Sequence, residues 1–130
     1  MNKKADDYKD KYQYKQKILK ATEDIINDYT TRHSKTMATR FDFHYPVDYQ
    51  HDTSTNKNIS FCMAKLVKKY KRYGLDPSFI WTREQRYSEN PHYHCMMLLN
   101  GSKTKNPYHI FKNAEKLWSL TIDSDASGLV

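Results

Sequence analysis

Two adjacent segments, residues 79–85 and 92–100, constrain the fold of this chain more than any other part of it. Their sequences, FIWTREQ and HYHCMMLLN, are rich in strand-forming residues, and only the short polar connection RYSENP separates them. Two strands joined by so short a connection pair with each other in antiparallel fashion. We therefore expect a β-hairpin here, with Asn100-Gly101 ending its second strand.

The other elements follow from the spacing of apolar residues along the chain. Helical spacing indicates amphipathic helices, whereas strict alternation that stops before Pro46 indicates a strand. The order helix, strand, helix, strand, strand, helix is typical of an α+β fold with an antiparallel-rich sheet and helices on one face. We expect its core to be the split βαβ arrangement of ferredoxin-like folds. Besides the hairpin, the predicted helices are 10–32, 57–73 and 107–121, and the predicted strand is 37–45.

The chain is short enough for a single globular domain. Its 130 residues fall within the roughly 100–200 residues of a typical domain. We interpret residues 1–35 as an N-terminal helical extension and residues 36–130 as the globular domain. The final residues, DSDASGLV, turn sharply and look like the start of another strand, so we expect the sheet to be C-terminally incomplete.

Composition excludes several classes of protein. No apolar run approaches the roughly 18–20 residues of a membrane span, and the N-terminus has no signal-peptide core. Two cysteines, Cys62 and Cys95, are too few for a disulfide framework and indicate a reducing compartment. We therefore expect a cytoplasmic protein with no membrane partner.

The net charge of +7 is concentrated in one segment. Between residues 57 and 73 the chain has six basic residues and no acidic one, with Tyr70 and Tyr73 among them. Such a segment attracts polyanions, although an ordinary solvated helix face has a similar composition. The residues that we assign to nucleic-acid binding in this segment are Lys65, Lys68, Lys69, Lys71 and Arg72.

The second strand of the hairpin carries a histidine pair. Alternation along a strand places His92 and His94 on the same face of the sheet. If Arg86 lies opposite His92, then Glu84 lies opposite His94. Opposed Cβ atoms are about 4.5–5.5 Å apart, which brings two imidazoles and one carboxylate within reach of a single ion. We predict a metal site at Glu84, His92 and His94, with coordination positions left open for water or a phosphate oxygen.

The first strand adds polar residues to the same face. Its apolar side chains Phe41 and Phe43 point to the helices, which turns Arg40, Asp42 and His44 toward the predicted metal site. We assign these three polar residues to nucleic-acid binding. The remaining aromatic and histidine residues have no such context, and we interpret Trp81 and Trp118 as packing residues and His33, His51 and His109 as surface residues.

Four segments of the chain resemble a known family. TRFDFHYP, FIWTREQ, NPHYHCMMLLNG and LWSL, all within residues 36–130, are similar in sequence and order to the inovirus-type replication initiators, YagK/YfjJ-like, of the HUH endonuclease superfamily. The resemblance implies Mg²⁺ or Mn²⁺ held by His92, His94 and Glu84, where it polarises a scissile phosphate. It further implies nicking of single-stranded or hairpin DNA in rolling-circle replication, a bacterial or phage-encoded protein, and host replication proteins as partners.

The nucleophile that the resemblance implies has no clear counterpart in this chain. In such enzymes a tyrosine attacks the phosphorus and becomes covalently linked to the DNA. Tyr108, at the start of the last predicted helix, is the candidate that remains for this role, because no tyrosine follows it and Tyr93 points away from the predicted metal site. Two alternatives therefore stay open: a non-catalytic regulator or inhibitor that binds nucleic acid or protein, and a ribonuclease that uses His92 and His94 as an acid–base pair.

Overall fold

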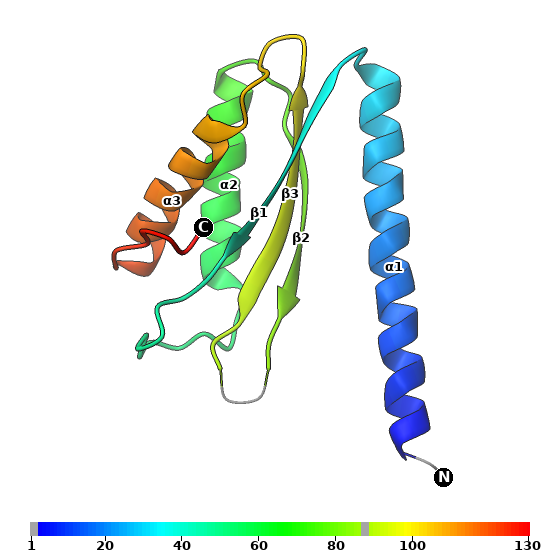
Figure 1. Cartoon of the computed structure of the whole chain (residues 1–130), viewed down its shortest axis with the longest axis vertical. Coiled ribbons are helices and arrows are strands. Elements are labelled where there is room, and N and C mark those ends of the chain that lie inside the picture. The colour runs from blue at the N-terminus through cyan, green and yellow to red at the C-terminus, as the bar shows by residue number, and fades with distance from the viewer. Residues whose placement is uncertain (1–2, 87–88) are drawn as a thin grey trace.

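The computed structural model describes residues 3–86 and 89–130 of the chain. Every predicted helix and strand is present except the strand expected to begin after the last helix, and the predicted ends lie within two residues of the observed ones except at the start of the first helix. That helix begins at residue 3 and not at residue 10, because the charged residues 3–9 include no glycine or proline that would interrupt it. The elements are α1 (Lys3–Arg32), β1 (Thr36–Phe43), α2 (Lys57–Arg72), β2 (Ser78–Glu84), β3 (His92–Asn100) and α3 (Tyr108–Ile122) (Figure 1).

The three strands form one antiparallel sheet in the order β1-β3-β2. Because β3 is antiparallel to both neighbours, β1 and β2 run in the same direction on either side of it, and α2 connects them. This is the split βαβ arrangement that the order of elements predicts. The α+β fold class is therefore confirmed.

The pairing of β2 with β3 differs from the predicted register by two residues. Glu84 lies opposite His92, whereas the prediction placed it opposite His94. The end of β2 is held from outside the hairpin, because the Arg83 guanidinium donates to the carbonyl of Thr53 at 2.9 Å and to Asn56 Oδ1 at 2.9 Å. A shift by an even number of residues keeps every side chain on its predicted face.

Helices α2 and α3 pack side by side against one face of the sheet (Figure 1). The hydrophobic core lies between these two helices and the sheet. Every second residue of β3 points into it, as alternation predicts, and Trp118 of α3 is fully buried there. The Trp118 indole donates to the carbonyl of His44 at 2.7 Å, which ties α3 to the end of β1. The strand residues in this core are Phe41, Phe43, Tyr93, Cys95, Met97 and Leu99.

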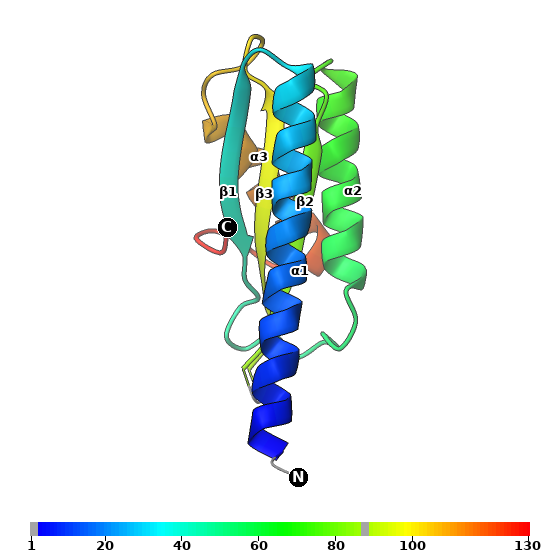
Figure 2. The same cartoon turned by 90° about the vertical axis from the view of Figure 1, so that its right-hand side faces the viewer.

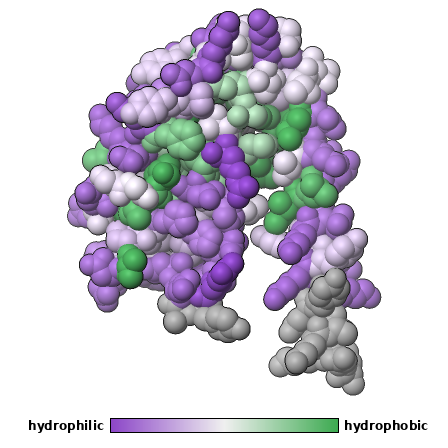
Figure 3. Space-filling model, viewed as in Figure 1, coloured by the Kyte–Doolittle hydropathy of each residue, from purple (hydrophilic) through white to green (hydrophobic). Residues whose placement is uncertain are grey.

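Helix α1 lies against the opposite face of the sheet, so the predicted arrangement of helices on one face describes only α2 and α3 (Figure 2). Its last turn is the anchored part. Tyr29 is fully buried and donates to the carbonyl of Leu75, while Arg32 and His33 both contact Asp76. Toward its N-terminal end α1 stands apart from the domain, and the space-filling view shows an open gap there (Figure 3). The polar end of the sheet faces this gap.

The residues after α3 do not form the predicted strand. Asp123 adopts a left-handed conformation (φ 52°) that ends the helix, and Gly128 has a positive φ within the turn that follows. Leu129 then accepts one backbone hydrogen bond, at 2.9 Å, from the N–H of His44 at the outer edge of β1. Within residues 3–86 and 89–130, no helix is both long enough and apolar enough to cross a membrane.

Candidate metal centre

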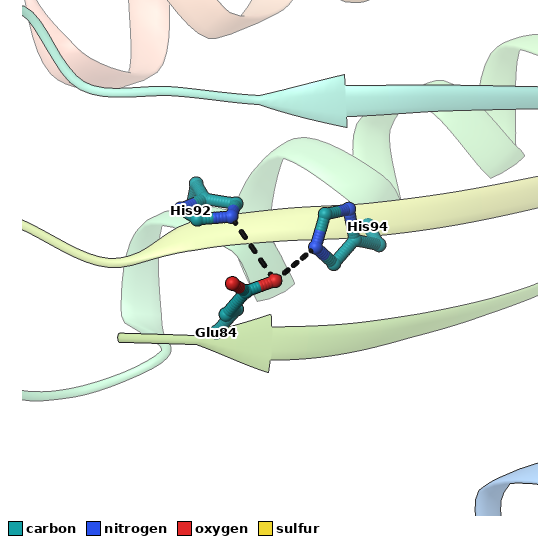
Figure 4. A group of neighbouring side chains, drawn as sticks. All are labelled: Glu84, His92 and His94. Atoms are coloured by element: carbon teal, nitrogen blue, oxygen red, sulfur yellow. Dashed lines mark hydrogen bonds and ion pairs between the residues drawn. The ribbon is translucent and has the colours of Figure 1, made fainter. Parts of the chain in front are cut away.

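Three side chains meet on the sheet face that α2 and α3 leave open. Glu84 is the last residue of β2, and His92 and His94 are the first and third residues of β3 (Figure 4). All three are half-buried, and each offers a ligand atom within 4.8 Å of the other two. The structure thus brings together the three residues that the sequence predicts as metal ligands.

The contacts within this group converge on one atom. Oε2 of Glu84 lies 2.6 Å from Nε2 of His94 and 3.2 Å from Nε2 of His92. Both imidazoles therefore turn the same ring nitrogen toward the same carboxylate. Two imidazole nitrogens and one carboxylate oxygen on one side of an ion form a donor set that suits divalent transition metals and leaves open positions. The group could hold a metal ion.

Asp42 supports this group from the neighbouring strand. It lies directly opposite His94 in the β1–β3 pairing, and its Oδ1 is 3.0 Å from Nδ1 of His94. A carboxylate that accepts from Nδ1–H fixes the ring orientation and leaves Nε2 to bind a metal. The structure therefore gives Asp42, which the sequence assigns to nucleic-acid binding, a contact that orients a predicted ligand.

The charges of the group are coupled through His94. The hydrogen bond from His94 holds the pKa of Glu84 below its ordinary value, so this carboxylate is ionised at neutral pH. Glu84, and after it Asp42, raise the pKa of His94. When His94 is protonated and no metal is bound, its two N–H groups donate to the two carboxylates, from Nδ1 to Asp42 and from Nε2 to Glu84. A metal ion that binds Nε2 must displace the proton there.

Two further predicted residues lie beside the group. The ring of His44 stacks on His92 with a centroid distance of 5.1 Å, and burial lowers the pKa of His44. Arg40 is exposed, with its Nε 4.0 Å from Oδ1 of Asp42. Arg86, which was not predicted to belong to the site, places its Nε 3.4 Å from Oε1 of Glu84. Basic groups therefore surround the carboxylates on the open face.

A cavity of about 580 Å³ adjoins this group, with His44 and His92 in its wall. The loop after β1 supplies the opposite wall, including the aromatic rings of Tyr45 and Tyr49, which pack 4.8 Å apart. Sequence reasoning missed this cavity because its loop carries only turn signals, and the loop is positioned by Asn90, which contacts residues 49 and 53. The lining residues are His44, Tyr45, Pro46, Val47, Tyr49, Gln50, Glu89, Asn90, Pro91 and His92.

The other predicted residues lie elsewhere. The basic residues of α2 belong to the layer on the far face of the sheet, where Lys65, Lys68 and Arg72 line a separate groove beside α3. Tyr108 is exposed at the start of α3 and faces Lys112, near the end of β3 that is distant from His92 (Figure 1). The structure therefore brings neither the basic segment nor Tyr108 to the histidine pair.

The fold and the site together define a small α+β domain that carries a two-histidine, one-carboxylate cluster on the open face of a split βαβ sheet. The chain belongs to the YagK/YfjJ C-terminal domain family, whose family model matches residues 1–129. That match includes α1 as well as the globular part. Neither the comparison with curated proteins nor the comparison with solved structures gives a match.

Proposed function

We propose that this protein is a metal-dependent DNA-nicking domain of the replication-initiator type, which binds single-stranded or hairpin DNA in rolling-circle replication. The observation that carries the proposal is the convergence of Glu84, His92 and His94 beside a cavity on an open sheet face. Such an activity belongs in the cytoplasm, where host replication proteins are its further partners.

The chemistry of the cluster favours Mn²⁺ over Mg²⁺. Mg²⁺ prefers oxygen ligands in octahedral geometry, whereas imidazole nitrogens suit transition metals. A divalent cation bound here supplies positive charge to a phosphate oxygen. The protein's own contribution is to orient the ligands, because Asp42 fixes the ring of His94 and the antiparallel ladder fixes the backbones of Glu84 and His92.

The basic groups on the open face suit a phosphodiester strand. Arg40 and Arg86 flank the carboxylates, and neither is buried. Arginine side chains pair with phosphate oxygens through several N–H groups at once, so they can position a strand whatever its sequence. The adjoining cavity, with its tyrosine rings, offers stacking surfaces for an unpaired base.

The same cavity also contains a tyrosine in a better position than Tyr108. Tyr49 lines the cavity with His92, and we propose its phenol as the nucleophile, which forms a 5′-phosphotyrosine link as the bond from phosphorus to the 3′-oxygen of the strand breaks and leaves a 3′-hydroxyl. Burial raises the pKa of Tyr49, so attack requires a proton acceptor. His44 lines the same cavity, and burial lowers the pKa of its imidazole, which keeps it neutral near pH 7 and able to accept that proton.

The test is cleavage of single-stranded and hairpin DNA pools of random sequence, with Mn²⁺ or EDTA. We expect Mn²⁺-dependent cleavage that is lost in the His92→Ala/His94→Ala double variant and retained in Glu23→Gln, which changes an exposed carboxylate of α1. A protein–DNA adduct on a denaturing gel should survive Tyr108→Phe and disappear in Tyr49→Phe. Calorimetry that detects no Mn²⁺ binding by the wild-type protein would contradict the metal site itself.

A non-catalytic binding module is the second candidate, and the position of Tyr108 at the start of α3, away from the histidine pair, favours it. Such a module binds DNA without an adduct and without cleavage, and its affinity falls steeply with salt. The ribonuclease alternative predicts RNA cleavage that persists in EDTA. The same set of assays therefore separates all three activities.

A further inference from the structure

A second cavity, of about 420 Å³, lies between the end of α2 and the start of α3. It shares no lining residue with the cavity beside the histidine pair, and it belongs to the helical layer on the other face of the sheet. Its wall combines lysine ammonium groups, hydroxyl groups and an amide with few apolar side chains. The lining residues are Lys69, Tyr70, Tyr73, Leu75, Lys103, Thr104, His109 and Asn113.

A chain of four hydrogen bonds crosses this wall. Lys69 Nζ donates to Asn113 Oδ1 at 3.0 Å, and Asn113 Nδ2 donates to Tyr70 Oη at 3.1 Å. Tyr70 Oη lies 3.0 Å from Nδ1 of His109, and His109 Nε2 lies 2.8 Å from Oγ1 of Thr104. His109, which the sequence analysis interprets as a surface residue, is thus half-buried in the middle of a network.

The donor and the acceptor of each hydrogen bond in this network follow from Lys69. An ammonium group can only donate, so Lys69 fixes Oδ1 of Asn113 as the acceptor and Nδ2 as the donor. Tyr70 Oη accepts that bond, and its own proton is then directed at Nδ1 of His109. Burial lowers the pKa of His109, so the ring is neutral and carries its proton on Nε2. The bond from Nε2 to Thr104 leaves the Thr104 hydroxyl proton without an acceptor in the network.

Two positive charges face the same cavity without a counter-ion. Lys69 is half-buried and contacts the neutral Asn113, while Lys103 is exposed and its Nζ donates to the carbonyl of Gly74 at 3.2 Å. Within residues 3–86 and 89–130 neither lysine has a carboxylate within ion-pair distance, and no acidic residue lines the cavity. Partly burying the ammonium group of Lys69 without a counter-ion is unfavourable unless an anion joins it.

The cavity also continues into the basic groove of α2. Lys69 and Tyr73 line both, and the groove adds Lys65, Lys68 and Arg72. Tyr73 is largely exposed, so one face of its ring is available for stacking. The anion that fits is one that can extend along a row of positive charges or present an aromatic ring to Tyr73.

We propose that this cavity is a phosphate-binding site, which takes the phosphate group of a nucleotide or of a nucleic-acid strand. Lys69 and Lys103 supply the charge, and the Thr104 hydroxyl supplies a directed donor. The site is separate from the metal centre and does not depend on the nicking activity.

The test is calorimetric titration of the full chain with inorganic phosphate, AMP and a short oligothymidylate with or without a 5′-phosphate. We expect saturable phosphate binding that Lys103→Gln weakens about tenfold, as loss of a charge-assisted hydrogen bond does, and that Thr104→Val weakens less. Lys105→Gln is the matched control, because it removes the same charge from the same loop outside the cavity. Binding should be unchanged in the His92→Ala/His94→Ala double variant.

The two phosphate sources separate in the same titrations. Tighter binding of AMP than of the 5′-phosphorylated oligomer identifies a free nucleotide, and the reverse order identifies a strand. Equal weakening by Lys103→Gln and Lys105→Gln would show a general charge effect and overturn the proposal. Absence of saturation up to high millimolar phosphate would overturn it too.

Discussion

Neighbouring residues of β3 point to opposite faces of the sheet. Side chains on one face pack in the apolar core, whereas those on the other face make polar contacts. Tyr93 and Cys95 point into the core beneath α2 and α3, where both are buried. His92 and His94 point to the open face, where they stay half-exposed and contact carboxylates. The first face stabilises the fold, and the second tolerates polar groups at the end where α1 stands apart from it, although Tyr29 and Leu98 are buried farther along the same face. One strand can therefore hold a metal centre without weakening the packing behind it.

The largest effect that separates the two faces is expected from the core. Trp118→Ala should lower the free energy of unfolding by about 3–5 kcal/mol, because it removes a fully buried ring and leaves a cavity. Leu120→Ala, an exposed position on the same helix, should change it by less than about 0.5 kcal/mol. Urea denaturation of both variants measures the difference. Similar midpoints for the two would mean that α3 does not pack as described.

On the open face, the sharpest test is a residue that is not itself a ligand. Asp42→Asn should reduce Mn²⁺ affinity roughly 10–100-fold, as loss of a hydrogen-bonding partner behind a histidine ligand does. Asp48→Asn, in the exposed loop after β1, is the control and should leave the affinity unchanged. Titration calorimetry at fixed pH gives both constants. An unchanged Mn²⁺ affinity in Asp42→Asn would show that Asp42 does not orient a metal ligand.

A smaller effect should appear in the pH dependence of the metal-free protein. The pKa of His94 is raised above its ordinary value of 6.5, so its contribution to stability is complete below that value and is lost as pH rises through the folded-state pKa. The pKa of Glu84 is lowered from 4.5, so its contribution is present above 4.5 and is lost as pH falls through the folded-state pKa. The urea midpoint should therefore fall both at acidic pH, where Glu84 becomes protonated, and at high pH, where His94 loses its proton. In Glu84→Gln the dependence should flatten, and a wild-type profile for that variant would contradict the coupling.

The smallest effect concerns the basic groove of α2, on the other layer. If the groove contacts DNA phosphates, Lys68→Gln should reduce the slope of log affinity against log salt by about 1. His92→Ala should leave that slope unchanged, because it removes no cation from the groove. Fluorescence anisotropy at several salt concentrations measures both slopes. An unchanged slope in Lys68→Gln would exclude Lys68 from the DNA contact.

Local pattern accounts for much of the fold and for the composition of the candidate site. Alternation along 92–100 places the histidine pair on the open face and Tyr93 on the core face, and both are confirmed. The register could not be predicted, because Arg83 fixes it through contacts with a loop about 30 residues earlier in the chain. The histidines and the glutamate still lie on one face only because the register is shifted by an even number of residues.

The features that sequence reasoning missed all depend on contacts between distant segments. His109 has no neighbour in sequence that marks it, and its partner Tyr70 lies 39 residues away. The cavity beside the candidate metal centre is likewise formed when Asn90 contacts the loop after β1. A periodicity argument describes one element at a time, so it cannot place two loops against each other.

The attachment of α1 has a mechanical consequence. Within the described residues, its hydrogen bonds to the rest of the domain come only from its last turn and the residue that follows, through Tyr29, Arg32 and His33. A helix of 30 residues is about 45 Å long at 1.5 Å per residue. In such a helix, fixed at one end, a small rotation at that end produces a large displacement of the other. A rotation of about 10° at this joint would move its far end by about 8 Å over that length, so the width of the gap over the candidate metal centre is set by a few contacts around Asp76.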